Sequence, residues 1–217
     1  MSDELVNRDF KAWVDSMEMP KGKRQVILAA MKLFSQQGFD GTSTQQLAQE
    51  SGMSQATIFK YFKTKEDLLR WIVTPIIQNV MPVYVDEFKN KLSHKKADLR
   101  ELIHFIVRDR YQFLLDNDEV ALILISSFLT KTEIRDEFAG LLSERGPEMV
   151  GLFRSLLDGT GEVRDGIDVV AVMRMIISQV VFYFLQTDRM MVGKSASEID
   201  LDLSRIEDLI YSAVCFR

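Results

Sequence analysis

Residues 44–62 read TQQLAQESGMSQATIFKYF, and this stretch predicts two short helices joined by a glycine turn. Leu47 faces inward from the first helix, and Gly52 supplies the permissive backbone of the turn. Ile58 and Phe62 form the apolar side of the second helix. This arrangement is typical of a helix-turn-helix, which places its second helix in the major groove of DNA.

The outward side of the second helix carries polar and basic residues. These residues are Gln55, Thr57, Lys60 and Tyr61. Amide and hydroxyl groups at a helix N-terminus can reach base edges, while lysine and tyrosine contact phosphates. For this spacing alone, a small helical hairpin with a polar face and no DNA-binding role is the alternative interpretation.

The flanking residues favour the DNA-reading interpretation. Upstream, residues 23–37 have the pattern of an amphipathic helix that ends at Gly38. Ser43 and Gln46 have capping-box spacing for the next helix, and Thr64 has the hydroxyl expected at the start of a fourth. The sequence therefore predicts three small helices followed by a fourth that leaves the bundle.

Basic charge is concentrated in the same segment. Residues 20–65 contain seven basic and two acidic residues, a net charge of +5, whereas the whole chain carries −5. Because DNA is an anionic polymer, we expect this segment to bind it with an affinity that falls steeply with added salt. Solvated surface lysines without a partner are the alternative.

The chain resembles the TetR family of bacterial transcription regulators over roughly its first third. The matching residues are Ala29-Ala30, Leu33-Phe34, Gly38-Phe39, Thr42-Ser43-Thr44, Leu47-Ala48, Ser51-Gly52-Met53-Ser54 and Phe59-Lys60-Tyr61-Phe62-Lys63-Thr64-Lys65-Glu66-Asp67-Leu68. The resemblance implies an all-α chain, with an N-terminal three-helix helix-turn-helix DNA-binding domain followed by a larger helical ligand-binding and dimerisation domain. It also implies DNA contacts from Thr44, Ser54, Gln55, Thr57, Lys60, Tyr61 and Lys65. Phe59 departs from the pattern, because the family often has a tyrosine there that bonds phosphate.

A chain of 217 residues with 47% hydrophobic content can bury a substantial core. The sequence predicts that this chain has three parts. They are an N-terminal extension at 1–19, a helix-turn-helix DNA-binding domain at 20–65, and a helical effector-binding and dimerisation domain at 66–217. Four apolar residues at helical spacing predict a short helix in the extension, namely Phe10, Trp13, Val14 and Met17. Its partner surface is not deducible from the sequence, and we treat the helix as structural.

Beyond residue 65 the pattern predicts helix after helix, with a kink or stop around Pro75. Further helices are expected over 97–116, 118–130, 133–157, 166–187 and 203–216. The helix over 133–157 has a weak point at Gly146-Pro147.

The segment 166–187 is apolar almost all round, so it needs cover on both sides. We expect one face to pack within its own domain and the other against a second copy of the chain, with the last helix completing the interface. The predicted interface residues are Val181, Phe184, Leu185, Ile206, Leu209, Ile210 and Ala213. A membrane span is the alternative, but Arg174 and Gln179 lie inside the run and make insertion costly.

The larger domain has the composition of a small-molecule receptor. Candidate effector-binding residues are Phe105, Arg108, Tyr111, Phe128, Met149, Phe153, Met173 and Ile177. Ordinary core packing is the alternative for aromatic and methionine side chains at helical spacing. The resemblance implies that a partly apolar effector, bound here, releases the protein from a two-fold symmetric DNA operator.

Catalytic, cofactor and metal sites are not predicted. His94 and His104 are ten positions apart, which does not place them on one helical face, and the sequence has neither a phosphate-cradling glycine loop nor a nucleophile elbow. The single cysteine, Cys215, excludes an internal disulfide, and the N-terminus lacks the order of a secretory signal. These features favour a cytoplasmic protein.

The predicted function is a homodimeric transcriptional regulator, and its action as a repressor is implied by the resemblance alone. An activator would have the same sequence features. The alternative from another class is a dimeric helical ligand-binding or protein-interaction module that no longer reads DNA. Loss of DNA affinity on replacing recognition-helix residues would separate the two.

Overall fold

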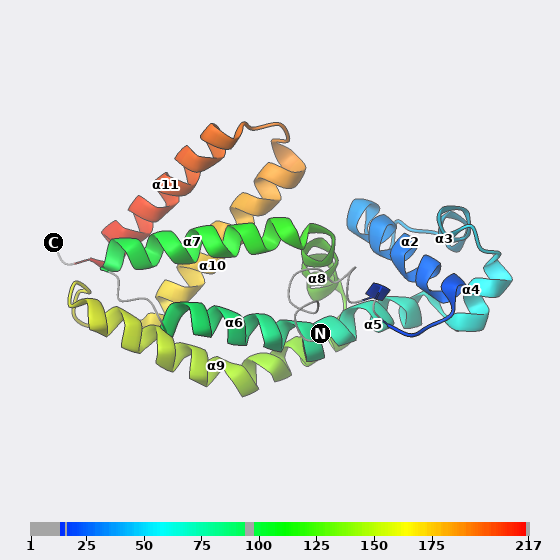
Figure 1. The fold of residues 1–217 in the computed structure, drawn as a ribbon, viewed down its shortest axis with the longest axis horizontal. Coiled ribbons are helices and arrows are strands. Elements are labelled where there is room, and N and C mark those ends of the chain that lie inside the picture. Colours follow the sequence, from blue (N-terminus) through cyan, green and yellow to red (C-terminus); the bar gives the residue numbers. More distant parts are fainter. Residues whose placement is uncertain (1–13, 16, 94–97, 216–217) are drawn as a thin grey trace. The chain divides into compact units, whose positions relative to one another are not determined.

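The computed structural model describes residues 14–15, 17–93 and 98–215, and its helices are drawn in Figure 1. Within these ranges the regular structure is helical, apart from an isolated antiparallel bridge between Val163 and Cys215. The predicted all-α fold class is confirmed. The chain divides into two compact units. The first comprises the described residues up to Asp86 together with Asp116–Glu144, and the second comprises Glu87–Leu115 with the described residues from Arg145 onward.

The helices follow the predicted order. They are α2 (Lys21–Gln37), α3 (Thr44–Ser51), α4 (Gln55–Tyr61), α5 (Lys65–Pro75), η1 (Ile76–Val80), α6 (Met81–Ser93), α7 (Leu99–Asp116), α8 (Asp118–Thr130), α9 (Thr132–Thr160), α10 (Val169–Leu185), η2 (Gln186–Met190) and α11 (Ala196–Val214). The two η segments are single stretches of π-helix.

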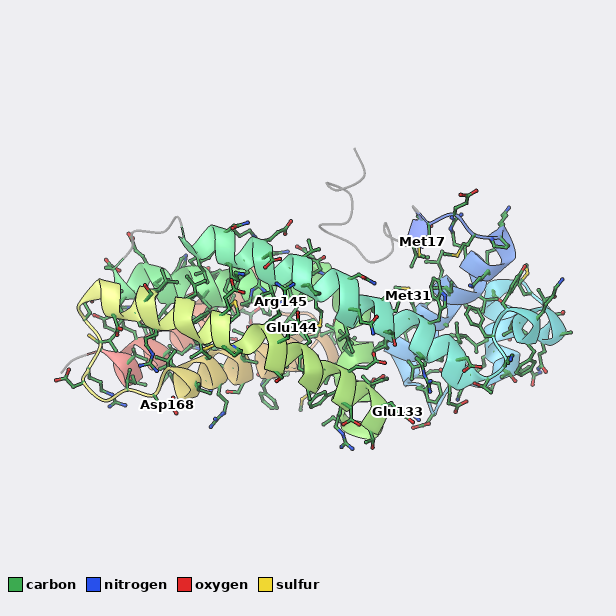
Figure 2. The ribbon with its side chains drawn as sticks, turned by 90° about the horizontal axis from the view of Figure 1, so that it is seen from below. Met17, Met31, Glu133, Glu144, Arg145 and Asp168 are labelled. Carbon is green, nitrogen blue, oxygen red and sulfur yellow. The ribbon has the colours of Figure 1, made fainter. Side chains whose placement is uncertain are left out.

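Helix α2 is the centre of the first unit. It packs against α3, α4, α5 and α8. Its buried residues include Ile27, Met31 and Phe34, and the partner helices bury Leu47 and Ile58. Met31 is fully buried on α2 (Figure 2). Burial of side chains of this size, each contributing about 1.5–3 kcal/mol, is what holds such short helices together.

Local capping fixes where the small helices begin, as the sequence predicted. Ser43 and Gln46 form a capping box at the start of α3, and Thr64 forms one with Asp67 at the start of α5. Gly52 ends α3 with a left-handed φ of 66°. Since glycine has no Cβ, it adopts this conformation at no steric cost, which lets the chain turn directly into α4.

The turn between α2 and α3 depends on Gly41. A Cβ placed on Gly41 would lie 2.4 Å from the carbonyl oxygen of Gln37, and both positions are fixed by backbone. We therefore expect Gly41→Ala to lower the free energy of unfolding by about 1–3 kcal/mol, because the turn must shift to relieve the contact. Urea unfolding would measure this.

Gly140→Ala is the matched control for that substitution. Gly140 lies inside α9, and no heavy atom stands within 4 Å of its added Cβ. This variant should be neutral or more stable by up to about 1 kcal/mol, since alanine favours a helix over glycine. Equal stability of the two alanine variants would contradict the steric argument for the turn.

The predicted kink at Pro75 takes the form of a π-helical insertion rather than a stop. Pro75 is the last residue of α5, and the N–H of Met81 bonds the carbonyl of Ile76 across η1 before α6 continues. Proline lacks an N–H and so breaks the regular ladder, and a π-turn absorbs the break without ending the helix.

Helix α9 is longer than predicted and does not break at Gly146-Pro147. It runs from Thr132 to Thr160 with Pro147 inside it, and it passes through Glu144 and Arg145 without interruption (Figure 2). Pro147 removes the hydrogen bond to the carbonyl four residues earlier, at Ser143, and both residues are exposed. Water can therefore bond the freed carbonyl, which explains why the helix continues.

Helix α11 begins seven residues before the predicted start. Ser195 caps it, and the side chains of Ser195 and Glu198 form a capping box. This start signal is present in the sequence as Ser-x-x-Glu, and the predicted start at residue 203 did not take it into account. The buried side of α11 includes Ile210 and Val214, which are fully inaccessible.

The N-terminal extension is held by α2 where the structure describes it. Val14 is fully buried. The guanidinium of Arg24 donates to the carbonyls of Val14 and Met17 at 3.3 Å and 2.5 Å, and it lies 3.8 Å from the carboxylate of Asp15. Phe10 and Trp13, which the predicted helix includes, lie outside the described residues.

Two helical stretches are long and apolar enough to cross a membrane by length and composition alone. They are Lys65–Leu92 and Val169–Met190, and 41% and 33% of their apolar windows are buried. Core helices of soluble proteins pass the same test, so it is weak evidence for a span. The second stretch contains α10, which has one side covered by its own unit and one side exposed.

Candidate nucleic-acid interface

The recognition helix α4 begins at a serine cap. The hydroxyl oxygen of Ser54 accepts the N–H of Thr57 at 3.1 Å, and the two hydroxyl oxygens lie 2.9 Å apart. Both hydroxyls therefore help to form the first turn of the helix. Gln55 occupies the first helical position and is exposed, which leaves its amide available to a base edge.

The exposed side of α4 includes two residues that sequence reasoning did not place at the interface. Ala56 is exposed, and the ring of Phe59 is 44% exposed, beside the predicted contact Lys60, which is also exposed. An exposed apolar side chain on a recognition helix can contact a thymine methyl group. Phe59 follows Gln55 by four positions, so helical spacing alone would have placed the two on one side.

Tyr61 lies against α2. A Cβ built on Gly22 would lie 3.1 Å from the phenol oxygen of Tyr61, so the hydroxyl reaches the first turn of α2. Tyr61 is half-buried, and Thr44, in the first turn of α3, is half-buried as well. Both remain predicted DNA contacts, and Tyr61 also joins α4 to α2.

Lys65 uses its ammonium inside the first unit. Its Nζ donates to the carbonyls of Phe39 and Thr42, each at 2.8 Å, and lies 4.2 Å from the centroid of the Phe39 ring. Because the Lys65 ammonium donates to two backbone carbonyls of the α2–α3 turn, it is less available to bind a phosphate. The structure thus assigns Lys65 a structural role that the sequence interpretation did not include.

Three further basic residues of the segment 20–65 are also engaged internally. The Nζ of Lys23 lies 5.5 Å and 5.0 Å from the ring centroids of Phe62 and Trp71. Arg24 binds the N-terminal extension, and Lys32 pairs with Glu50 at 2.6 Å. The local excess of positive charge is real, but much of it stabilises the module.

The lysines that remain available to bind DNA phosphates are Lys21, Lys60 and Lys63. All three side chains are exposed, and none forms a hydrogen bond or an ion pair with another described residue. Lys60 lies in the last turn of α4, whereas Lys21 is the first residue of α2. Lys21 and Lys63 were counted in the basic segment but were not predicted as DNA contacts.

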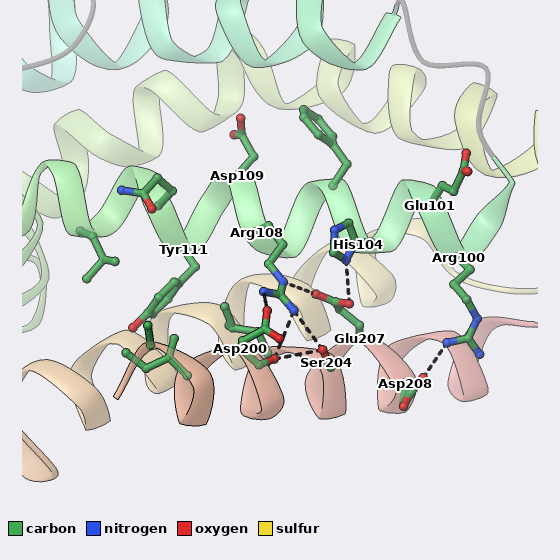
Figure 3. Close-up of a pocket in the computed structure, with 16 residues that line it drawn as sticks. Arg100, Glu101, His104, Arg108, Asp109, Tyr111, Asp200, Ser204, Glu207 and Asp208 are labelled. Atoms are coloured by element: carbon green, nitrogen blue, oxygen red, sulfur yellow. Dashed lines mark hydrogen bonds and ion pairs between the residues drawn. The ribbon is translucent and has the colours of Figure 1, made fainter. Parts of the chain in front are cut away.

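The second unit contains a groove between α7 and α11, with a volume of about 1220 Å³. Figure 3 shows Arg108 of α7 reaching toward Ser204 and Glu207 of α11. The Nε of Arg108 donates to Glu207 at 2.6 Å, and its guanidinium also pairs with Asp200. The groove therefore has a polar network along its floor.

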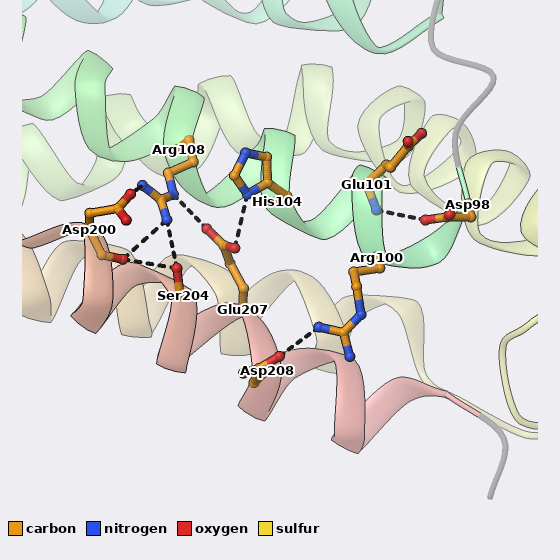
Figure 4. A network of polar contacts seen from close by, with 9 residues as sticks. All are labelled: Asp98, Arg100, Glu101, His104, Arg108, Asp200, Ser204, Glu207 and Asp208. Atoms are coloured by element: carbon orange, nitrogen blue, oxygen red, sulfur yellow. Dashed lines mark hydrogen bonds and ion pairs between the residues drawn. The ribbon is translucent and has the colours of Figure 1, made fainter.

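This network extends along both helices, as Figure 4 shows. His104 Nδ1 lies 2.9 Å from the carboxylate of Glu207, and Arg100 donates to Asp208 at 2.6 Å. Burial works against the charge of Arg108, yet its hydrogen bonds to Glu207 and Asp200 raise its pKa above the ordinary value. Both arginines of the groove are already paired with carboxylates.

Only part of the predicted effector set lines this groove. Phe105, Arg108 and Tyr111 do, whereas Met149, Phe153 and Met173 do not. Phe153 is buried in the core of the second unit, where its ring lies 6.4 Å from that of Phe88. Phe128 belongs to the first unit and is 40% exposed, and Ile177 is 58% exposed on α10. Helical spacing could not separate core residues from groove residues.

The predicted interface residues differ in their burial. Phe184 and Ile210 are fully buried and Ile206 is nearly so, because their side chains form the core of the second unit. These three side chains are not available to a second copy of the chain, so their prediction as interface residues was wrong. Leu209 is 65% exposed, while the remaining predicted residues are half-buried; these are Val181, Leu185 and Ala213.

The exposed apolar surface on the two helices includes residues that were not predicted. On α10 they are Val170, Ile177 and Phe182, and on α11 Leu201 joins Leu209. Val170 and Ile177 are seven positions apart, so they lie on one side of α10. Apolar side chains gathered on neighbouring helices mark a surface for association.

Within the described ranges, no group of three His, Cys, Asp or Glu residues is placed to hold a metal ion. The first unit carries the recognition helix with its exposed lysines, and the second unit carries the polar groove.

Comparison with known proteins supports a regulatory function. The model of a family described as bacterial regulatory proteins, tetR family, matches residues 26–72. The fatty acid metabolism regulator protein of Bacillus subtilis (strain 168) is 24% identical over 196 residues, which cover 85% of this chain and 95% of that protein. These comparisons point to transcriptional regulators rather than to enzymes.

Solved structures of regulators share the fold. The transcriptional regulator FadR from Bacillus subtilis in complex with stearoyl-CoA superposes with a TM-score of 0.57 at 19% identity, over 86% of this chain and 96% of that one. The ketosteroid transcriptional regulator KstR2 of Mycobacterium tuberculosis gives a TM-score of 0.63 at 12% identity, over 93% and 98%. At these identities the likeness concerns the fold.

Proposed function

The chain belongs to the TetR family of bacterial transcriptional regulators, and we propose that it is a homodimeric repressor that reads a two-fold symmetric DNA operator. The observation that carries this proposal is the exposed start of α4. Ser54 caps the helix, Gln55 is exposed at its first position, and Lys60 and Lys63 flank it as exposed ammonium groups. This combination of base-reading and phosphate-binding groups suits a major groove.

Dimerisation follows from what a single module can read. One α4 spans only a few base pairs, whereas two copies about 34 Å apart would enter successive major grooves on one side of the duplex. The exposed apolar residues of α10 and α11 are the surface that we assign to the second copy. Because bacterial DNA lies in the cytoplasm, a regulator that reads it would be cytoplasmic.

The groove between α7 and α11 is the proposed effector site. Its apolar lining includes Phe105 and Leu115, and its polar network is centred on Arg108. Stearoyl-CoA, the ligand of the FadR structure, is an anion, but Arg100 and Arg108 are already engaged by carboxylates. A partly apolar molecule that bonds this network, without needing a free cationic group, fits the groove better.

Replacing Gln55 tests the recognition function. We expect Gln55→Ala to weaken binding to the protein's selected operator by about 1–3 kcal/mol and to relax the preference at one base position in each half-site. The substitution is exposed, so the fold should be unaffected. The measurement is a titration against the operator and against duplexes altered at single positions.

Lys89→Ala is a suitable control for that titration, since Lys89 lies on α6 in the second unit and pairs there with Glu148. It should leave the base preference unchanged. Wild-type protein that prefers no sequence in a selection from random DNA would contradict the proposed function. It would favour the alternative of a dimeric ligand-binding or protein-interaction module.

A further inference from the structure

The end of α8 reaches the turn between α2 and α3 within the first unit. Helix α8 packs along α2, and Lys131 follows its last residue, with the Lys131 N–H bonded to the carbonyl of Ser127 at 2.7 Å. The Nζ of Lys131 lies 4.3 Å from the centroid of the Phe39 ring and 3.5 Å from a carboxylate oxygen of Asp40. A residue about ninety positions away in sequence thus contacts the turn that precedes the helix-turn-helix.

Phe39 receives two ammonium groups. Lys65 lies 4.2 Å from the centroid of the same ring, and Phe34 packs edge-on against it at 5.3 Å. Phe39 is only 7% exposed. A cation held over a ring that is largely withdrawn from water is attracted more strongly than one at a free surface. We call Lys131, Phe39 and Lys65 the turn clamp.

The turn clamp is bonded to the backbone of the turn that precedes α3. Lys65 binds the carbonyls of Phe39 and Thr42, while the hydroxyl of Thr42 donates to the carbonyl of Gly38 at 2.8 Å. Two residues therefore hold the turn. Lys65 reaches it from the start of α5, and Lys131 reaches it from the end of α8. Since α3 follows at Thr44 and leads through Gly52 into α4, the orientation of the recognition helix depends on this turn.

The ring contact is the main part of the Lys131 interaction. Asp40 is 75% exposed at its side chain, so its pair with Lys131 is screened by water and contributes little. The Lys131 side chain is 25% exposed, and it covers a buried ring. Loss of this ammonium would leave the turn held from one side.

We propose that Lys131 is a positioning residue for DNA reading, which acts through Phe39 on the α2–α3 turn and so on the placement of α4. Hydrogen bonds to base edges tolerate only small displacements of the reading helix, whereas nonspecific attraction to phosphates does not depend on such placement. Lys131 therefore affects specific binding more than nonspecific binding. This inference rests on the proposed DNA-reading function.

The test compares Lys131→Met with Lys131→Arg. Methionine keeps an apolar side chain but removes the ammonium, whereas arginine retains a cation that stacks on a ring. We expect Lys131→Met to weaken binding to the selected operator about fivefold, with arginine restoring most of the affinity. In a Phe39→Leu background, which lacks the ring, Lys131→Met should have no further effect.

Lys91→Met is the charge-matched control, because Lys91 lies on α6 and pairs with Asp109 in the second unit. Each variant is also titrated with a scrambled duplex. An operator-specific loss that Lys91→Met does not reproduce supports the proposal. Equal losses on both duplexes, a loss matched by Lys91→Met, or no loss at all overturns it, since these outcomes leave only a charge effect or none.

Amide hydrogen exchange over residues 38–43 provides a readout without DNA. Faster exchange in Lys131→Met than in wild type or Lys131→Arg supports the turn clamp, and unchanged exchange overturns it. Failure of the DNA-reading function itself would appear differently, as wild-type protein without sequence preference.

Discussion

Ile177→Asp is expected to convert the protein to a monomer and to weaken operator binding about 100-fold or more. Ile177 is 58% exposed in the single chain, so the substitution should cost little in folding. In the proposed dimer it would be covered, and burying an unpaired carboxylate there is unfavourable. A monomer binds one half-site and loses the gain from engaging two half-sites at once. Sedimentation and operator titration measure the two effects.

Leu142→Asp is the matched control for this change. Leu142 lies on α9, is 55% exposed and carries an apolar side chain of the same size. It should leave both the dimer and operator affinity unchanged. If Ile177→Asp stayed dimeric, the α10 surface would not be the interface. If it became monomeric without losing operator affinity, two-fold reading of the operator would be contradicted.

Local signals predicted much of the helix-turn-helix. The capping box of Ser43 with Gln46 and the hydroxyl cap of Thr64 act over three residues, so they are recognisable in sequence and formed as expected. The start of α11 depends on the same kind of signal, Ser195 with Glu198, which the predicted start at residue 203 did not take into account. Boundaries set by such short-range hydrogen bonds are predictable when every capping pattern is tested.

Contacts between distant residues were not predictable in the same way. Lys65 was predicted to contact DNA from the family resemblance, but its ammonium donates to carbonyls 23 and 26 positions earlier. The groove residue Arg108 finds its partners in α11, more than ninety positions later. Helical periodicity gives the side of a helix on which a residue lies, but not the neighbour that covers that side. Phe184 and Ile210 were placed at an interface for this reason.

The division of the basic residues into internally engaged and available ones predicts how steeply DNA affinity falls with salt concentration. Seven basic residues lie in the segment 20–65, but the structure engages Lys23, Arg24, Lys32 and Lys65 internally. The exposed basic residues that are not engaged in this way are Lys21, Lys60 and Lys63. Each lysine that neutralises a phosphate contributes about −0.9 to the slope of log affinity against log salt concentration. The slope should therefore depend on these three residues rather than on the net charge of the segment.

Replacing Lys21, Lys60 and Lys63 together with glutamine should reduce the magnitude of that slope by about 5 for a dimer and weaken operator binding about 1000-fold or more at low salt. The contrasting variant replaces Lys91, Arg100 and Arg205 with glutamine, which changes the net charge equally in exposed positions of the second unit. Its slope should stay near that of the wild type, because these residues lie outside the unit that contains the recognition helix, and charges that do not contact phosphates release no counterions. Equal changes in the two slopes would mean that overall charge, and not the three exposed lysines beside the recognition helix, governs DNA binding.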